Sequence, residues 1–483
     1  MLSRFFQYVK KNKYVQYMLV YVAIMAILHV FMREYDSDTV GYYSRASWEE
    51  PSFGIGALYR LLKYRYESWT SRIVLEAPLF VLTHGMHQLL WSVINLIMHG
   101  ILYVALDCLT DHKHSRLLLL TILLYPVYEM GTAGWITCYI IYWWTLTLVS
   151  ISLLSLKVMH EDGRLSVVQM IICVMCEFYA TSLEQFAGLY LGILVLFTML
   201  MIADQRFTPS RVAFTVIQYV ICIGNIVFAL TGPGNHVKEG YGVWYWFPDY
   251  DSLTIVDKMV MAVNTTMSFL TEKSIIWFVF VVLILMIVLV KYPRDVFRSA
   301  VAAFPVAITI IRSFLSTAGK AYFPDYMYIL DVYSDAARVD PTNYNSPSGY
   351  IPFILYMTVV TAVLCSIVWI CIPDSDVTSD VPSLDRIADV RETWVLLYVI
   401  ILGFAVRGVM GFSPTIYASS QRTFMVTEFV LIYLIQRLYG RQMKLFDVLP
   451  GQFPRLCRIG MICLAVLSVI NNLLTITNRY YYG

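Results

Sequence analysis

The sequence predicts an all-α polytopic membrane protein, and three observations lead to this fold class. Hydrophobic residues make up 59% of the 483 residues and charged residues only 14%, whereas soluble globular proteins carry about 25% charged residues. The apolar runs are about 17 to 25 residues long, the length at which an α-helix spans a bilayer. A membrane β-barrel needs segments of about ten residues in which apolar and polar residues alternate. The apolar runs do not show this pattern, so helices are expected throughout.

Dividing the chain at its polar breaks gives about thirteen expected spans. Arg4, Lys10, Lys11 and Lys13 precede the first apolar run, and the positive-inside tendency then places the N-terminus in the cytoplasm. We expect a retained first helix in a multi-pass protein of the cell (plasma) membrane, because this run is too long for a signal peptide. The expected spans are 14–32, 86–109, 117–128, 134–156, 166–181, 186–202, 212–231, 275–291, 300–318, 349–372, 394–412, 423–440 and 459–476.

The chain 1–483 is expected to form a single transmembrane domain whose outer loops are 33–85, 232–274 and 319–348. The first outer loop contains two helical patterns. Residues 53–65 alternate apolar and basic positions at helical spacing, which is typical of a helix lying in the membrane interface. The apolar run Ile73 to Thr83 is too short to span and is expected to form a second juxtamembrane or re-entrant helix.

Net charge and cysteine positions exclude several classes of protein. The formal net charge is only +2, so nucleic acid is not an expected partner. All nine cysteines lie away from the large outer loops, so neither a disulfide framework nor a thiolate metal site is expected. No Walker sequence or metalloprotease motif occurs. We expect no cofactor and no resident metal ion.

An acidic segment follows the first expected span. Asp36 and Asp38 form an Asp-x-Asp pair, the pattern with which nucleotide-sugar transferases hold a metal against a diphosphate. Those enzymes carry it in a soluble domain for which this chain has no room. The alternative is a solvated turn at the end of a helix. The segments downstream favour a functional role.

These segments form an ordered set on the expected outer side of the membrane. Gly41-Tyr42 follows the acids, and Tyr66, Trp69 and Arg72 form a Tyr-x-x-Trp-x-x-Arg motif. With them the chain resembles bacterial membrane glycosyltransferases of the GT-C superfamily, of the type that decorates O-antigens and cell-wall polysaccharides. The other matching pieces are Leu183-Glu184-Gln185-Phe186-Ala187, Gly232-Pro233-Gly234-Asn235, and Ser413-Pro414 through Arg422.

The resemblance implies a GT-C-like helix bundle with interfacial helices in the first outer loop. It also implies a polyprenyl-phosphate sugar as donor, a lipid-linked or wall glycan as acceptor, and a carboxylate of the first outer loop as general base. The family shows two adjacent acids, whereas this chain has Asp38-Thr39. Both Asp38 and Asp36 therefore remain candidates for the catalytic base.

Sugar transfer from a phosphate also needs cations that neutralise the leaving group. Arg312 and Arg407 fall in the outward halves of apolar segments, and Arg422 immediately precedes one. Because an intramembrane arginine is costly to insert, it usually has a functional or structural partner. Arg422 is the principal phosphate candidate because it lies in a matching motif. For Arg407 the alternative is neutralisation by Glu428.

Six further residues are expected to shape the substrate cleft. Glu184 lies in a short outer turn, where it is placed to hold an acceptor hydroxyl or to orient Arg72, or is simply solvated. The glycine-rich turn before Asn235 and His236 leaves their side chains available to sugar or phosphate, unless the loop merely turns. The complete set is Arg72, Glu184, Asn235, His236, Tyr42 and Trp69.

The function expected from these features is inverting transfer of a sugar from a polyprenyl monophosphate to a surface polysaccharide or lipid-linked glycan on the extracytoplasmic face. One alternative is a flippase or transporter of lipid-linked glycans, although such proteins place their polar groups at mid-membrane. The other is a polysaccharide polymerase, which joins whole repeat units.

Overall fold

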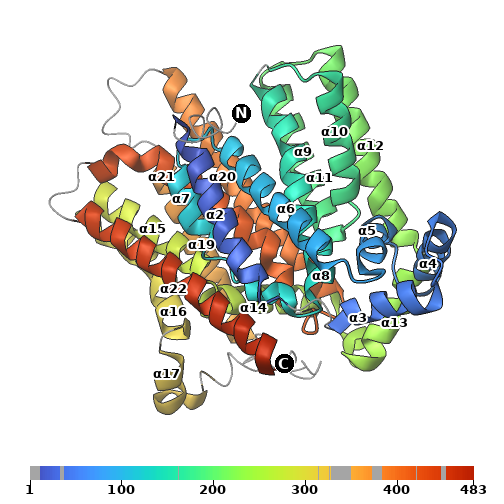
Figure 1. Cartoon of the computed structure of the whole chain (residues 1–483). Coiled ribbons are helices and arrows are strands. Elements are labelled where there is room, and N and C mark those ends of the chain that lie inside the picture. The colour runs from blue at the N-terminus through green and yellow to red at the C-terminus, as the bar shows by residue number, and fades with distance from the viewer. Residues whose placement is uncertain are drawn as a thin grey trace. The chain divides into compact units, whose positions relative to one another are not determined.

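The computed structural model describes residues 11–32, 37–161, 163–313, 315–325, 327, 350–371, 383–419, 421–447 and 453–482. These residues form helices and connecting turns, with no strand among them (Figure 1). They divide into two compact units. The first comprises Met1–Gly240 and Met461–Gly483, and the second comprises Tyr241–Gly460.

Eight helices in the described part of the chain are long and apolar enough to cross a membrane. The number is nine if α14 (Ile255–Glu272) and α15 (Ile275–Lys291), which meet at 80°, count as one broken span. The chain is therefore a multi-pass membrane protein by helix length and hydropathy. The eight spans are Gln88–Leu109, Trp135–His160, Glu184–Ala203, Pro209–Thr231, Val296–Ser313, Ile351–Cys371, Val390–Phe412 and Pro454–Tyr481.

The first unit contains most of the helices of the N-terminal half. In it α6 packs on α2 and α9, α10 and α11 pack on α9, and α12 packs on α10 and α11. Their bounds are α2 (Lys13–His29), α3 (Ser37–Ser44), α4 (Ile55–Ser68), α5 (Ile73–Thr83), α6 (Gln88–Leu109), α7 (Ser115–Ile122), α8 (Trp135–Cys138), α9 (Trp144–His160), α10 (Val167–Ala180), α11 (Glu184–Ala203), α12 (Pro209–Thr231), the start of α13 (Pro233–Tyr245) and the end of α22 (Phe453–Tyr482).

Helix starts in this unit follow ordinary capping chemistry. Ser166 and Gln169 form a capping box before α10, and the Thr208 side chain accepts from the Arg211 amide while Pro209 opens α12. These side chains satisfy amide groups that have no partner inside the helix. The capped residues lie at the polar breaks that separate the expected spans.

The second unit is built around α15. This helix contacts α14, α16, α19 and α21, and α20 packs on α14, α19 and α21. Buried Trp277 on α15 donates from Nε1 to Thr309 Oγ1 on α16 at 3.0 Å. The remaining bounds are α16 (Val296–Ser313), α17 (Ser316–Tyr322), α19 (Ile351–Cys371), α20 (Ser383–Gly408) and α21 (Met425–Asp447).

Most of the expected apolar runs form helices, but the structure differs from the expectations in three respects. Both helices expected in the first outer loop form, as α4 and α5. The expected third span, 117–128, is wrong as a crossing because α7 has only eight residues. The segment 232–274 is not an open loop, since it contains α13 and the largely buried α14. About thirteen spans were expected, whereas eight or nine are found among the described residues.

Candidate functional site

A buried ion pair fixes the corner between α4 and α5. Arg65 of α4 donates from Nε to Glu76 Oε2 at 2.8 Å and from Nη2 to Glu76 Oε1 at 2.7 Å. Glu76 is 2% exposed. Tyr42 of α3 adds a third member, because its hydroxyl donates to Glu76 Oε1 at 2.6 Å and accepts from Arg65 Nη2 at 3.0 Å. The three helices α3, α4 and α5 are thereby held together by charge-assisted hydrogen bonds.

The same contacts set the charge states of these groups. Burial disfavours the charged form of Arg65 and so acts to lower its pKa. The interactions with Glu76 and Tyr42 outweigh the effect of burial and hold the pKa of Arg65 above its usual value. Burial and the neighbouring Glu76 raise the pKa of Tyr42, with a smaller contribution from Asp38. Tyr42 is therefore a neutral hydrogen-bond donor at physiological pH.

A second ion pair joins the N-terminus of α5, where Arg72 is the N-cap, to α11. Arg72 donates from Nη2 to Glu184 Oε2 at 2.7 Å and from Nε to the same oxygen at 3.0 Å. Glu184 is therefore hydrogen-bonded to Arg72 rather than simply solvated. The Arg72 side chain remains 22% exposed, so its guanidinium is still accessible from solvent.

The first turn of α13, which contains Gly234 and Asn235, packs on the segment between α4 and α5. The Ser71 amide donates to Asn235 Oδ1 at 3.1 Å, and Asn235 Nδ2 donates to Ser71 Oγ at 2.8 Å. A Cβ on Gly234 would lie 2.5 Å from the Thr70 amide nitrogen, so only glycine allows this approach. Asn235 thus has a structural role, because its side chain is occupied by Ser71 and the Ala229 carbonyl.

Lys238 lies one turn of α13 beyond Asn235 and brings a third cation to this region. Burial and the repulsion of Arg72 lower the pKa of Lys238 to about 8, while Glu184 only partly compensates. Arg65 and Glu76 act on it more weakly. Three cations therefore surround two carboxylates, which leaves one positive charge in excess. Such a cluster of lysine and arginine is suited to a phosphate.

One of the two expected catalytic acids, Asp38, lies at the start of this assembly. Asp38 is exposed in the first turn of α3, four residues before Tyr42 and therefore on the same helical face. Buried Thr39 anchors α3 to α8, because its Oγ1 lies 3.1 Å from Thr137 Oγ1. Asp36 lies outside the described residues. Asp38 is accordingly a solvent-accessible carboxylate on a helix that Tyr42 and Thr39 hold in place.

The two remaining expected residues of the first unit lie at its surface. His236 is exposed on α13, next to Asn235. Trp69 is half-buried at the end of α4, with its ring 6.0 Å from the Arg65 guanidinium carbon. The structure thus brings Tyr42, Trp69, Arg72, Glu184 and Asn235 into one assembly.

The other three expected arginines belong to the second unit. Arg312 is 3% exposed and donates from Nη2 to Ser268 Oγ and to Glu272 Oε2, each at 2.9 Å. Arg422 is half-buried in the short helix Gln421–Phe424. Arg312 is therefore committed to an ion pair at the end of α14.

Arg407 forms no ion pair with Glu428 in the described part of the chain. Its guanidinium carbon lies 4.2 Å from the centre of the Phe424 ring, and its Nε and Nη1 have no hydrogen-bond partner among the residues that the structure describes. Glu428 accepts instead from Ser274 Oγ at 2.8 Å. Arg407 is thus a buried cation held by an aromatic ring, with donors left for a further anion.

The sequence patterns did not identify Arg65, Glu76 or Lys238 as site residues. Glu76 could have been recognised, because it is the one charged residue in the apolar run 73–83 and a buried acid needs a partner. Arg65 lies about three helical turns before it in the same loop. Lys238 gave no such signal, since only the fold shows that it lies beside Arg72.

Within the ranges that the structure describes, no group of three or more histidine, cysteine, aspartate or glutamate side chains could hold a metal ion. The fold and the charged assembly define a multi-pass helical membrane protein with an anion-compatible cluster on one unit. The chain matches no protein-family model, no curated protein and no solved structure.

Proposed function

We propose that the protein is a glycosyltransferase that moves a sugar from a polyprenyl monophosphate to a cell-surface polysaccharide or a lipid-linked glycan. The reaction takes place on the extracytoplasmic face and inverts the anomeric centre. Asp38 is the general base, with Asp36 as the other candidate. Lys238 and Arg72 bind the donor phosphate, and Arg422 and Arg407 are further phosphate candidates in the second unit.

The chemistry is a single displacement. The acceptor hydroxyl oxygen attacks the anomeric carbon, its proton passes to the Asp38 carboxylate, and the bond between that carbon and the phosphate oxygen breaks. The polyprenyl phosphate leaves with one more negative charge than it had in the donor. A cluster with one surplus positive charge lowers the barrier, because it stabilises charge that grows in the transition state.

The observation that carries this proposal is the position of Lys238. Its ammonium group lies beside the Arg72–Glu184 pair, and it forms no ion pair with any described residue. A lysine that burial and like charges destabilise is ready to gain an anion. Polyprenyl-linked phosphate is such an anion, and it is held at a membrane surface by its tail.

The direct test is a transfer assay with the full chain in lipid nanodiscs. Polyprenyl phosphates that carry glucose, galactose, mannose or N-acetylglucosamine serve as donors, and membranes of a strain lacking the protein supply the acceptor. The proposal expects free polyprenyl phosphate and a glycan heavier by one sugar. Addition of whole repeat units would support a polymerase instead. Unchanged donors and glycans throughout would overturn the assignment.

A second candidate function is transport of a lipid-linked glycan. It is favoured by the 80° break between α14 and α15, since broken helices with polar groups at the break are typical of transporters. Arg312 and Glu272 pair next to this break. Movement of a fluorescent lipid-linked glycan across proteoliposomes, without any change in its mass, would support this alternative.

A further inference from the structure

A cysteine, a histidine and an aspartate meet where α6 ends. His112 Nδ1 lies 2.6 Å from Asp107 Oδ2, and Cys108 Sγ lies 3.5 Å from His112 Nε2. Because the Asp107 carboxylate only accepts, the neutral imidazole carries its proton on Nδ1 and leaves the Nε2 lone pair facing the thiol. This is the order of nucleophile, base and orienting acid found in nucleophilic catalysis.

The local backbone and its neighbours hold this arrangement. Asp111 and His112 both have positive φ, 58° and 56°, which is unfavourable for non-glycine residues but returns the imidazole toward Cys108. Asp107 is fully buried, accepts also from Ser115 Oγ at 3.0 Å, and keeps its other oxygen, Oδ1, without a partner. Cys108 itself is only half-buried, so a reagent can reach its sulfur.

Charged and titratable groups from the packed helices complete the surroundings. From α2, the Tyr14 ring lies 4.6 Å from the His112 ring. From α9, Lys157 donates to the Cys108 carbonyl and to Asp111. His112 is the group that faces the thiol and is placed to accept its proton.

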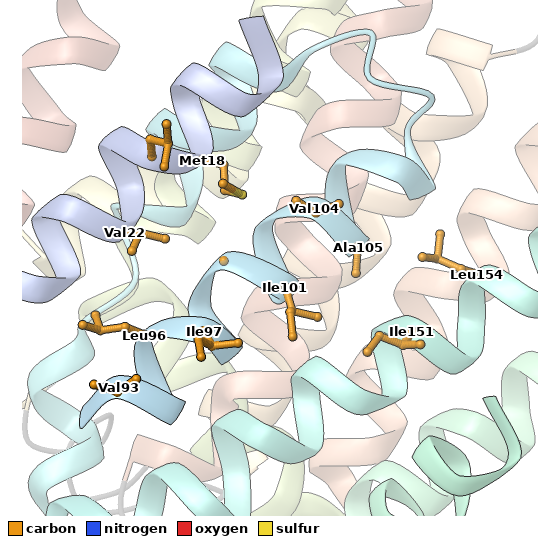
Figure 2. A pocket seen from close by; sticks show the side chains of 12 residues that line it. Met18, Val22, Val93, Leu96, Ile97, Ile101, Val104, Ala105, Ile151 and Leu154 are labelled. Carbon is orange, nitrogen blue, oxygen red and sulfur yellow. The ribbon is translucent and has the colours of Figure 1, made fainter. Parts of the chain in front are cut away.

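An apolar groove leads to this thiol. A cavity of about 640 Å³ lies between α2, α6 and α9. Figure 2 shows the side chains that line it. Its lining includes Met18, Ile101, Val104 and Leu154. Tyr14 lies one turn before Met18, Cys108 one turn after Val104, and Lys157 three residues after Leu154. Since residues three or four apart share a helical face, the groove continues toward the Cys108 side chain.

We propose that Cys108 accepts a long acyl chain from an acyl thioester and that this chain then occupies the groove. His112 Nε2 takes the thiol proton while Sγ attacks the thioester carbonyl carbon. The new bond from carbon to the cysteine sulfur forms, the bond to the donor sulfur breaks, and the leaving thiolate receives the proton from His112. One thioester replaces another, so no oxidant is needed. Asp107 is a positioning residue that fixes the tautomer of His112.

The proposal is independent of sugar transfer. The orientation expected from the sequence places Cys108 on the cytoplasmic side, where cells make acyl thioesters. A metal site is not a competing explanation, because these three side chains form no metal-binding group among the described residues. Cys463 provides a matched control, since it is more exposed than Cys108 and has no hydrogen-bonded histidine in the described part of the chain.

The test incubates the full chain in nanodiscs with palmitoyl-coenzyme A and follows each cysteine by peptide mass spectrometry. We expect Cys108 to gain the acyl group first and to lose it in hydroxylamine. His112→Gln should slow acylation at least tenfold. Asp107→Asn should lower the maximal first-order rate of acylation, with little change in the half-saturating concentration of palmitoyl-coenzyme A or in the thermal midpoint. Cys108→Ser should abolish the product, and Cys463→Ser should leave it unchanged.

Two further results decide the role of the groove. Ile101→Trp, which fills the groove, should slow the reaction with palmitoyl-coenzyme A at least tenfold but leave the reaction with acetyl-coenzyme A unchanged. Equal slowing with both donors would overturn the groove assignment. Acylation of Cys463 as fast as Cys108, or an unchanged rate in His112→Gln, would overturn the proposed nucleophile.

Discussion

Arg72 and Glu184 form an ion pair across 112 positions of sequence, with Arg72 Nη2 2.7 Å from Glu184 Oε2. The pair connects the N-cap of α5 to the first turn of α11. Asn235 binds Ser71, the residue that precedes Arg72. Three separate motifs of the sequence therefore meet around one guanidinium, and Lys238 lies close enough to be repelled by it. Such an assembly positions cations without neutralising all of them.

The Arg65–Glu76 pair predicts a strong effect of one conservative substitution. Glu76→Gln keeps an acceptor for the Tyr42 hydroxyl but leaves the guanidinium of Arg65, 14% exposed, without its counter-charge. Breaking a buried pair in this way costs about 3–5 kcal/mol, so thermal unfolding in detergent should shift clearly downward. Glu50→Gln, which removes the partner of the exposed Arg60, should produce no measurable shift. Equal shifts would show that the Arg65–Glu76 pair is not buried.

Alanine substitutions at Gly234 and Gly240 of α13 should change the stability of the protein in opposite directions. Gly234→Ala would place a Cβ 2.6 Å from the Trp69 nitrogen and the Tyr66 oxygen, which forces α13 away from α4 and costs about 1–3 kcal/mol. Sugar transfer should fall at least tenfold because Lys238 moves with α13. Gly240→Ala meets nothing within 4 Å and should stabilise the helix by up to about 1 kcal/mol. A tolerated Gly234→Ala would contradict the packing described above.

Lys238 predicts how donor binding depends on pH. Its pKa is lowered to about 8 by burial and by Arg72, so the ammonium is charged below pH 8 and neutral above it. An anionic donor should therefore bind the free protein about tenfold more weakly for each pH unit above 8, measured as kcat/KM, which reports the free enzyme.

Two variants isolate this titration. Lys238→Arg keeps its charge at every accessible pH and should give a flat profile between pH 7 and 9. Lys63→Met, which removes an exposed cation of the neighbouring α4, should retain the wild-type profile. A decline above pH 8 that persists in Lys238→Arg would assign the titration to another group.

Glu177 predicts a substitution that stabilises the protein. This residue of α10 is fully buried and neither carboxyl oxygen has a hydrogen-bond partner. Replacing an unsatisfied buried polar group by an apolar one of similar size should gain about 1–3 kcal/mol, so Glu177→Met should raise the thermal midpoint. Glu161→Met, at an exposed site, should not change it. A lower midpoint for Glu177→Met would mean that Glu177 binds a partner in the membrane.

Hydrophobic runs predicted α5 well because its apolar residues are bounded on both sides by polar ones. They missed α14 for a physical reason. Its buried Thr265, Thr266 and Thr271 make the segment read as polar, yet each hydroxyl donates to a carbonyl four residues earlier in the same helix. The polar groups are satisfied internally, so the helix can be buried.

The site was predictable only in part, for similar reasons. Motifs identified Arg72, Glu184 and Asn235, whose partners lie 112 and 164 positions away in the chain. Burial and then the neighbouring Arg72 lower the pKa of Lys238, and both depend on the close packing at Gly234. A property that arises from packing leaves no pattern in the sequence around the residue.

The rate of sugar transfer by Asp38→Asn tests the central proposal most directly. A general base contributes about 10²–10⁴-fold, so we expect kcat to fall at least a hundredfold in Asp38→Asn, or in Asp36→Asn if that residue is the base. Glu67→Gln, at an exposed carboxylate of the same loop, should keep the wild-type rate. Full transfer activity in both aspartate variants would contradict the assignment of the catalytic base to this loop.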